Sequence, residues 1–123
     1  ILARLAREVY TIERHAELAD AAAARLRTLG FANVHVLHGD GTLGWADHAP
    51  YDAIIVTAGG PTVPRALLDQ LKPGGRLVMP LGSELRAQRL IRRTPTGPET
   101  YTQDDLEWVA FVPLIGEQGW PER

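Results

Sequence analysis

The sequence predicts an α/β fold: a Rossmann-like, mostly parallel sheet that carries helices on both faces and ends in an antiparallel hairpin. Three observations predict it. Short β-branched or apolar runs alternate with segments of helical periodicity through the first two thirds of the chain. Residues 51–60, YDAIIVTAGG, form a near-continuous apolar run, as expected of a parallel strand that is covered on both faces. Residues 86–116 show no clear helical pattern.

The first half of the chain alternates helices and strands. Residues 1–9 repeat apolar side chains at helical spacing, and residues 9–13, VYTIE, are β-branched and aromatic as in a strand. A helix is predicted over 15–29, where Gly30 supplies a stop. Residues 34–37, VHVL, predict the next strand. The apolar stripe of the helix contains Ala19, Ala22, Ala23, Leu26 and Leu29.

The second half continues with the strand at 51–60 and a helix that Thr62 and Pro64 open. This helix is predicted to run through Leu71, and the sequence PGG then ends it. Residues 75–82, GRLVMPLG, predict a strand. The remainder predicts antiparallel strands in the runs QRLIRRT, PETYTQ and WVAFVPLIG, joined by PTGP and QDDL.

The composition limits the classes of protein that fit. With 123 residues, the chain has the size of a single domain, which we predict to cover residues 1–123. A net charge of −2, with both signs mixed, predicts neither a nucleic-acid nor a membrane partner. No apolar run approaches the roughly 20 residues of a membrane span. The absence of cysteine excludes a disulfide framework and fits a reducing cytoplasm.

Two acidic residues stand at consecutive predicted strand ends, where open α/β sheets bind ligands. The first strand ends in Glu13 and the second in Asp40, which lies between Gly39 and Gly41. Glu13 can accept hydrogen bonds from ribose hydroxyls, and Asp40 from an exocyclic amine beside glycines that admit a flat base. Either acid alone is more often a loop or turn residue, so their joint placement carries the prediction of a nucleotide site.

Other residues give weaker evidence for a functional site. His35 and His38 point to opposite faces of one strand, so no metal site is predicted. A basic stretch is predicted to be a solvated strand face; it contains Arg86, Arg89, Arg92 and Arg93. Three residues are predicted to pack rather than to recognise a ligand: Trp45, Trp108 and Trp120. The sequence contains no nucleophile elbow, P-loop or HExxH motif.

Four segments of the chain, taken together, resemble the protein-L-isoaspartate O-methyltransferases in order and spacing. They are VYTIER, LGFANVHVLHGDGTLGW, APYDAIIVTAGGPTVPRALLDQLKPGGRLVMPLG and VAFVPLIGEQGW. The resemblance runs from Ile1 to Trp120, and GDGTLGW, TAGGPTVP and FVPL are its most distinctive parts. It implies the class I methyltransferase sheet. It also implies methyl transfer from S-adenosylmethionine to the carboxylate of L-isoaspartyl or D-aspartyl residues in damaged proteins, with S-adenosylhomocysteine as product.

The resemblance also assigns site residues. It implies that Glu13 holds the ribose with Arg14 beside it, that Asp40 and Gly41 contact adenine, and that Gln118 contacts the cofactor. The substrate cleft would contain Thr57, Ala58, Pro113 and Leu114. No catalytic acid or base is expected, because an acceptor carboxyl with a pKa of about 3.9 is already ionised at neutral pH.

The main departure of the chain from the family is at its N-terminal side. In this fold the first strand and its glycine-rich loop precede the ribose acid by about 20 residues, which places them before Ile1. We expect a truncated domain, the C-terminal portion of a methyltransferase, inactive alone or active only with the missing N-terminal region. The absent strand would lie between the strands that end at Glu13 and Gly59.

Three alternatives stay open at this point. The chain could be a non-catalytic methyltransferase-like module or a half-domain that a partner completes. It could also be another class I methyltransferase that acts on a small molecule or RNA. A nicotinamide dehydrogenase fits Glu13 alone, but GDG and the terminal hairpin argue against it.

Overall fold

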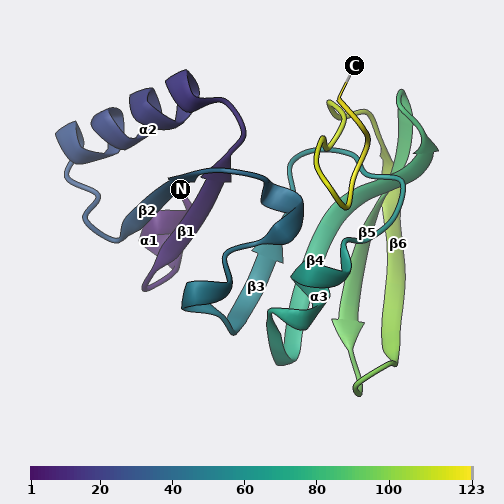
Figure 1. Ribbon diagram of the computed structural model, residues 1–123. Coiled ribbons are helices and arrows are strands. Elements are labelled where there is room, and N and C mark those ends of the chain that lie inside the picture. The colour runs from purple at the N-terminus through teal and green to yellow at the C-terminus, as the bar shows by residue number, and fades with distance from the viewer. Residues whose placement is uncertain (123) are drawn as a thin grey trace. The chain divides into compact units, whose positions relative to one another are not determined.

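The computed structural model describes residues 1–122, and the chain divides into two compact units, Ile1–Gly41 and Thr42–Arg123. The element order is helix, strand, helix, strand in the first unit and strand, helix, three strands in the second (Figure 1). This order confirms the α/β class and the C-terminal antiparallel hairpin that the sequence predicts.

The first unit is a two-stranded parallel sheet with a helix against it. Strand β1 (Val9–Glu13) pairs with β2 (Val34–His38) along its whole length, from Val9 opposite Val34 to Glu13 opposite His38. Helix α2 (Ala16–Thr28) lies along one face of this sheet (Figure 1). The short helix α1 (Leu2–Leu5) precedes β1.

Helix α2 follows its predicted boundaries closely. His15 is its N-cap residue, and Gly30 has a φ of 81°, a left-handed conformation that glycine adopts without steric cost. Ala19, the first residue of the predicted stripe, is buried. Leu29 does not belong to that stripe as predicted, because it lies past the last helical residue and is 63% exposed.

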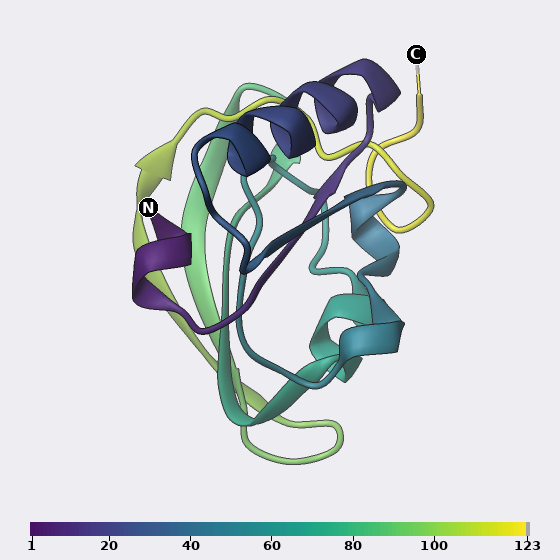
Figure 2. The ribbon, with the colours of Figure 1, turned by 90° about the vertical axis from the view of Figure 1, so that its left-hand side faces the viewer.

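The second unit holds a four-stranded mixed sheet. Its order is β3 (Tyr51–Ile55), β4 (Leu71–Glu84), β5 (Ala87–Pro95) and β6 (Tyr101–Val109). The pair β3 and β4 is parallel, and the other two pairs are antiparallel. Figure 2 shows the long β5–β6 hairpin and the loop that closes it. Helix α3 (Arg65–Asp69) precedes β4, and two 3₁₀ turns, η1 (Gly41–Leu43) and η2 (Ala46–His48), precede β3.

The core of the second unit lies between α3 and the sheet. Five buried apolar residues form it: Leu67, Leu71, Leu77, Met79 and Ile91. They come from α3, β4 and β5, and partly buried side chains such as Ile54 and Leu114 pack around them. Complete burial of each such side chain stabilises the fold by roughly 1.5–3 kcal/mol, so this cluster holds α3 on the sheet.

Several predicted boundaries differ from the structure; of the predicted strand run WVAFVPLIG, only the first two residues belong to β6, which ends at Val109. The strand predicted over 51–60 ends at Ile55, and Ile55 is 55% exposed, so the prediction that both faces are covered is wrong there. Helix α3 ends at Asp69 rather than Leu71, because residue 71 already pairs in the sheet. The run QDDL at 103–106 is not a connection but lies inside β6, where a register shift falls opposite Leu90 and Ile91.

The parallel sheet predicted as one is present as two. Within residues 1–122, β1 pairs only with β2, and β3 pairs only with β4. On one side, therefore, β1 and β3 each have backbone groups that do not pair with any other strand within the described residues. None of the helices in the described part of the chain is long and apolar enough to span a membrane.

Candidate functional site

The two predicted acids lie at neighbouring strand ends. Glu13 is the last residue of β1 and is paired in register with His38, the last residue of β2. The Gly39 amide donates a hydrogen bond to the Glu13 carbonyl at 3.0 Å, which carries the pairing one residue past β2. Asp40 follows directly. The expected placement at one sheet edge is confirmed, and the roles of both acids stay predictions.

The Glu13 side chain is half-buried at the start of α2. Its Oε1 accepts a hydrogen bond from the His15 backbone N–H at 3.0 Å. A carboxylate offers about four acceptor positions, so this contact orients the group and leaves capacity for hydroxyl donors. His38 Nε2 donates to the carbonyl of Arg14 at 3.0 Å, which joins the end of β2 to the residue after β1.

The backbone around Asp40 leaves room for a flat group. A Cβ built on Gly41 would meet no atom within 4 Å, and one built on Gly39 would meet nothing closer than 3.8 Å. This open backbone and the two acids fit the ribose and adenine of a nucleoside, the groups that the sequence predicts here.

Two of the predicted cleft residues of the second unit, Pro113 and Leu114, pair with the backbone of Gly59. Its N–H donates to the Val112 carbonyl at 2.7 Å, and its carbonyl accepts from the Leu114 N–H at 2.8 Å. This bridge places Pro113 directly opposite Gly59. Thr57 and Ala58 directly precede Gly59 in the chain, and the place of these residues in a substrate cleft stays a prediction.

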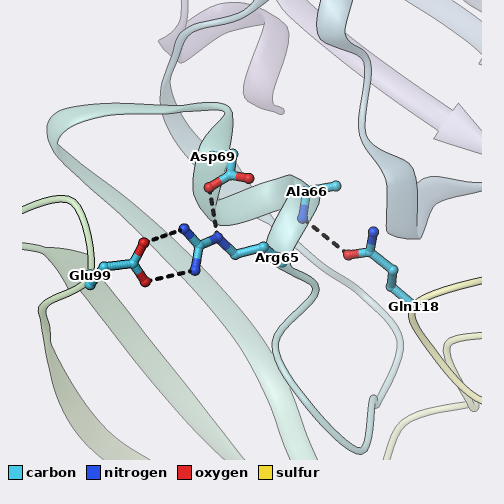
Figure 3. Close-up of polar contacts among 5 residues, drawn as sticks. All are labelled: Arg65, Ala66, Asp69, Glu99 and Gln118. Carbon is cyan, nitrogen blue, oxygen red and sulfur yellow. Dashed lines mark hydrogen bonds and ion pairs between the residues drawn. The ribbon is translucent and has the colours of Figure 1, made fainter.

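Gln118 is part of a structural clamp. Its Oε1 accepts a hydrogen bond from the Ala66 N–H in the first turn of α3 at 3.0 Å (Figure 3). The backbone N–H of Gln118 donates to Oγ1 of Thr42 at 3.1 Å, and Thr42 is completely buried. These contacts fix the C-terminal segment against α3. The contact of Gln118 with a cofactor stays a prediction.

A charged cluster ties α3 to the loop after β5. Arg65 donates from Nε to Asp69 at 2.8 Å and from both terminal nitrogens to the two carboxylate oxygens of Glu99, each at 3.0 Å (Figure 3). The hydrogen bonds from Arg65 lower the pKa of Glu99 below its ordinary value. The hydrogen bonds to Glu99 and then to Asp69 raise the pKa of Arg65. The cluster is exposed, so we assign it an orienting role rather than a large effect on stability.

Sequence reasoning missed two glutamines that hold loops near the predicted site. Gln70 Oε1 accepts from the Trp45 N–H at 2.9 Å, and its Nε2 donates to the Leu43 carbonyl at 3.0 Å. Gln88 is only 1% exposed and contacts the segment that follows β6. Nothing in the local sequence marks either residue, because each contacts a segment more than 20 positions away.

Trp108 does not pack inside the molecule as predicted. Its side chain is 70% exposed on β6, and the Arg89 guanidinium lies 5.0 Å from its ring centroid. Arg93 lies over Tyr101 in the same way, at 3.9 Å. The basic stretch therefore lies partly over aromatic rings.

Comparisons with known proteins converge on one family. The family described as Protein-L-isoaspartate(D-aspartate) O-methyltransferase matches residues 1–119. A relative named protein-L-isoaspartate O-methyltransferase 2, from Pelobacter propionicus, is 53% identical over 120 residues, which cover 98% of this chain and 53% of the relative.

Two solved structures have similar folds. A protein-L-isoaspartate O-methyltransferase superimposes with a TM-score of 0.84 at 30% identity, over 91% of this chain and 35% of the other. A putative protein-L-isoaspartate O-methyltransferase from Plasmodium falciparum, in complex with S-adenosyl-L-homocysteine, gives a TM-score of 0.73 at 25% identity, over 88% of this chain and 52% of the other. The chain spans about half the length of the curated relatives it matches.

Proposed function

The chain belongs to the protein-L-isoaspartate(D-aspartate) O-methyltransferase family, and from this premise we propose that the protein transfers a methyl group from S-adenosylmethionine to the carboxylate of L-isoaspartyl or D-aspartyl residues in damaged proteins. The observation that carries the proposal is the placement of Glu13 and Asp40 at the ends of paired parallel strands, in a chain of this family. Its cysteine-free composition supports a cytoplasmic location.

In this proposal the first unit binds the nucleoside part of the cofactor. Glu13 accepts hydrogen bonds from the ribose hydroxyls with Arg14 beside it, while Asp40 and the open backbone at Gly41 contact adenine. A charged acceptor makes hydrogen bonds worth about 1.5–3 kcal/mol each, roughly twice those of a neutral one. Binding of the nucleoside therefore depends strongly on the Glu13 carboxylate.

In this proposal four residues of the second unit contact the acceptor. Thr57, Ala58, Pro113 and Leu114 would form the cleft wall, held together by the paired backbone at Gly59. S-adenosylmethionine, when bound, supplies an electrophilic methyl group on a sulfonium. The residues of the chain need only hold the ionised acceptor in line and exclude water, since no proton has to be removed first.

We also propose that a further segment of the protein, upstream of Ile1, completes the site. Two observations support this. The matching region makes up about half of each curated relative, and β1 and β3 each pair with a single neighbour within residues 1–122. A strand with one unpaired side exposes backbone donors and acceptors that another strand can satisfy.

Calorimetric titration with S-adenosylhomocysteine tests the proposal. Two proteins are compared: the 123-residue chain, and a longer form in which the segment preceding the matching region of the Pelobacter propionicus relative is joined before Ile1. We expect binding by the longer form and at least about tenfold weaker binding by the chain alone, equivalent to about 1.4 kcal/mol.

The other outcomes contradict specific parts of the proposal. Equally tight binding by the chain alone would contradict the need for an upstream segment. Absence of binding in both proteins would contradict the cofactor assignment and favour a non-catalytic module.

A further inference from the structure

Gln88 is a buried polar residue whose side-chain amide joins three segments of the second unit. It lies on β5 and is 1% exposed. Its Oε1 accepts a hydrogen bond from the Phe111 N–H at 2.8 Å. Its Nε2 donates to the Leu85 carbonyl at 2.9 Å and makes a longer contact of 3.5 Å with the Glu84 carbonyl. The amide thus connects the β4–β5 turn to the chain that leaves β6.

The same amide lies directly against Gly59. A Cβ built on Gly59 would lie 2.8 Å from Cδ and 2.9 Å from Nε2 of Gln88, closer than such atoms approach. The N–H and the carbonyl of Gly59 are hydrogen-bonded to Val112 and Leu114, which come one and three residues after Phe111 in the chain. Gln88 therefore contacts both of the segments that pair at Gly59. It is in van der Waals contact with Gly59 itself, and it accepts a hydrogen bond from the 111–114 segment.

The choice of glutamine at this position is informative. An apolar side chain of similar size would fill the same volume without burying polar atoms, which are costly when they lack partners. Here both ends of the amide are hydrogen-bonded, and a fully satisfied buried group favours one arrangement of the segments around it. An apolar replacement would leave the Phe111 N–H without this acceptor, at a cost typical of an unsatisfied buried donor.

We propose that Gln88 is a positioning residue for the acceptor side of the site. It sets the distance between two segments of the chain. One carries Thr57 and Ala58, and the other carries Pro113 and Leu114. This inference rests on the proposed function, because these two segments affect activity only if they bind an acceptor. The proposed nucleoside residues belong to the first unit and Gln88 to the second, so in this proposal its effect falls on the acceptor.

Steady-state methylation of an isoaspartyl peptide by the longer form tests this role. For Gln88→Met we expect the peptide KM to rise about tenfold or more, while the Kd for S-adenosylhomocysteine changes less than about twofold. Gln88→Glu keeps the shape and an acceptor for Phe111 but loses the donor to Leu85. It is expected to raise KM in the same direction, and it decides the question if Gln88→Met does not fold.

Leu77→Ala is the matched control. Leu77 is completely buried in the same sheet, on β4, and lies opposite Arg93 in the pairing of β4 with β5. It is expected to lower the melting temperature at least as much as the Gln88 substitutions and to leave the peptide KM within about twofold. If the Gln88 substitutions act only through a general loss of stability, Leu77→Ala raises the peptide KM as well. If Gln88 has a positioning role, only the Gln88 substitutions raise it.

The outcomes separate the two proposals. An unchanged peptide KM in a folded, active Gln88 variant would overturn the positioning role alone, as would an equal rise in KM for Leu77→Ala. If the unsubstituted longer form binds S-adenosylhomocysteine but methylates no isoaspartyl peptide, the proposed function fails. In that case the role of Gln88 fails with it, because no acceptor of this class is then bound.

Discussion

Replacing Glu13 with glutamine is expected to weaken binding of S-adenosylhomocysteine to the longer form by roughly tenfold to a hundredfold. The substitution removes the negative charge that strengthens hydrogen bonds from ribose hydroxyls. The amide oxygen of glutamine can still accept from the His15 N–H, which Glu13 Oε1 does at 3.0 Å. The local fold should therefore persist, so the loss of affinity reports the charge. Calorimetry at fixed ionic strength measures it.

Glu17→Gln is the control for Glu13. Glu17 lies in the first turn of α2 and is exposed, so its substitution removes the same charge only a few residues away. The expected change in affinity is less than about twofold, since exposed charges are screened over roughly 8–10 Å in physiological salt. An equal loss in both variants would mean that net charge, and not the strand-end position, determines binding.

Gly59→Ala is expected to destabilise the second unit and to reduce methylation of an isoaspartyl peptide by the longer form. The new methyl group would lie 2.8 Å from Cδ of Gln88, whose amide is fixed by its own hydrogen bonds. Overpacking of this kind costs about 1–3 kcal/mol. Such a cost lowers the melting temperature by roughly 5–15 °C for a domain of this size. Thermal unfolding monitored by circular dichroism measures the change.

Two further variants show whether the contact with Gln88 is the cause. Gly97→Ala, in the same unit, would meet only the hydroxyl of the exposed Thr100 within 4 Å, so we expect a small change in melting temperature. In a Gln88→Ala background, Gly59→Ala should cost less than it does alone, because the obstructing amide is gone. Additive effects in this double-mutant cycle would contradict the contact.

Local patterns predicted the first unit well. The strand VYTIE and the helix before Gly30 appear where periodicity and the glycine stop place them. Because parallel strands end at one edge of a sheet, the sequence alone predicts that Glu13 and Asp40 lie close together. This was possible because both acids lie within two residues of a strand end.

The second unit was harder to predict because its details depend on contacts between distant segments. The charged run QDDL has the composition of a turn, yet it lies in the exposed edge strand β6, where polar side chains face solvent. Trp108 is exposed for the same reason. The role of Gln88 depends on Phe111 and Gly59, which are 23 and 29 positions away and which no local pattern connects.

The central claim is methyl transfer to an isoaspartyl carboxylate, and one acceptor comparison tests it most directly. The longer form is incubated with labelled S-adenosylmethionine and two peptides that differ only in whether one residue is isoaspartyl or aspartyl, with an RNA and a set of small-molecule acceptors alongside. We predict label in the isoaspartyl peptide, as a base-labile ester, and none above background in the aspartyl peptide. Label in the RNA or a small molecule, with none in the isoaspartyl peptide, would contradict the claim.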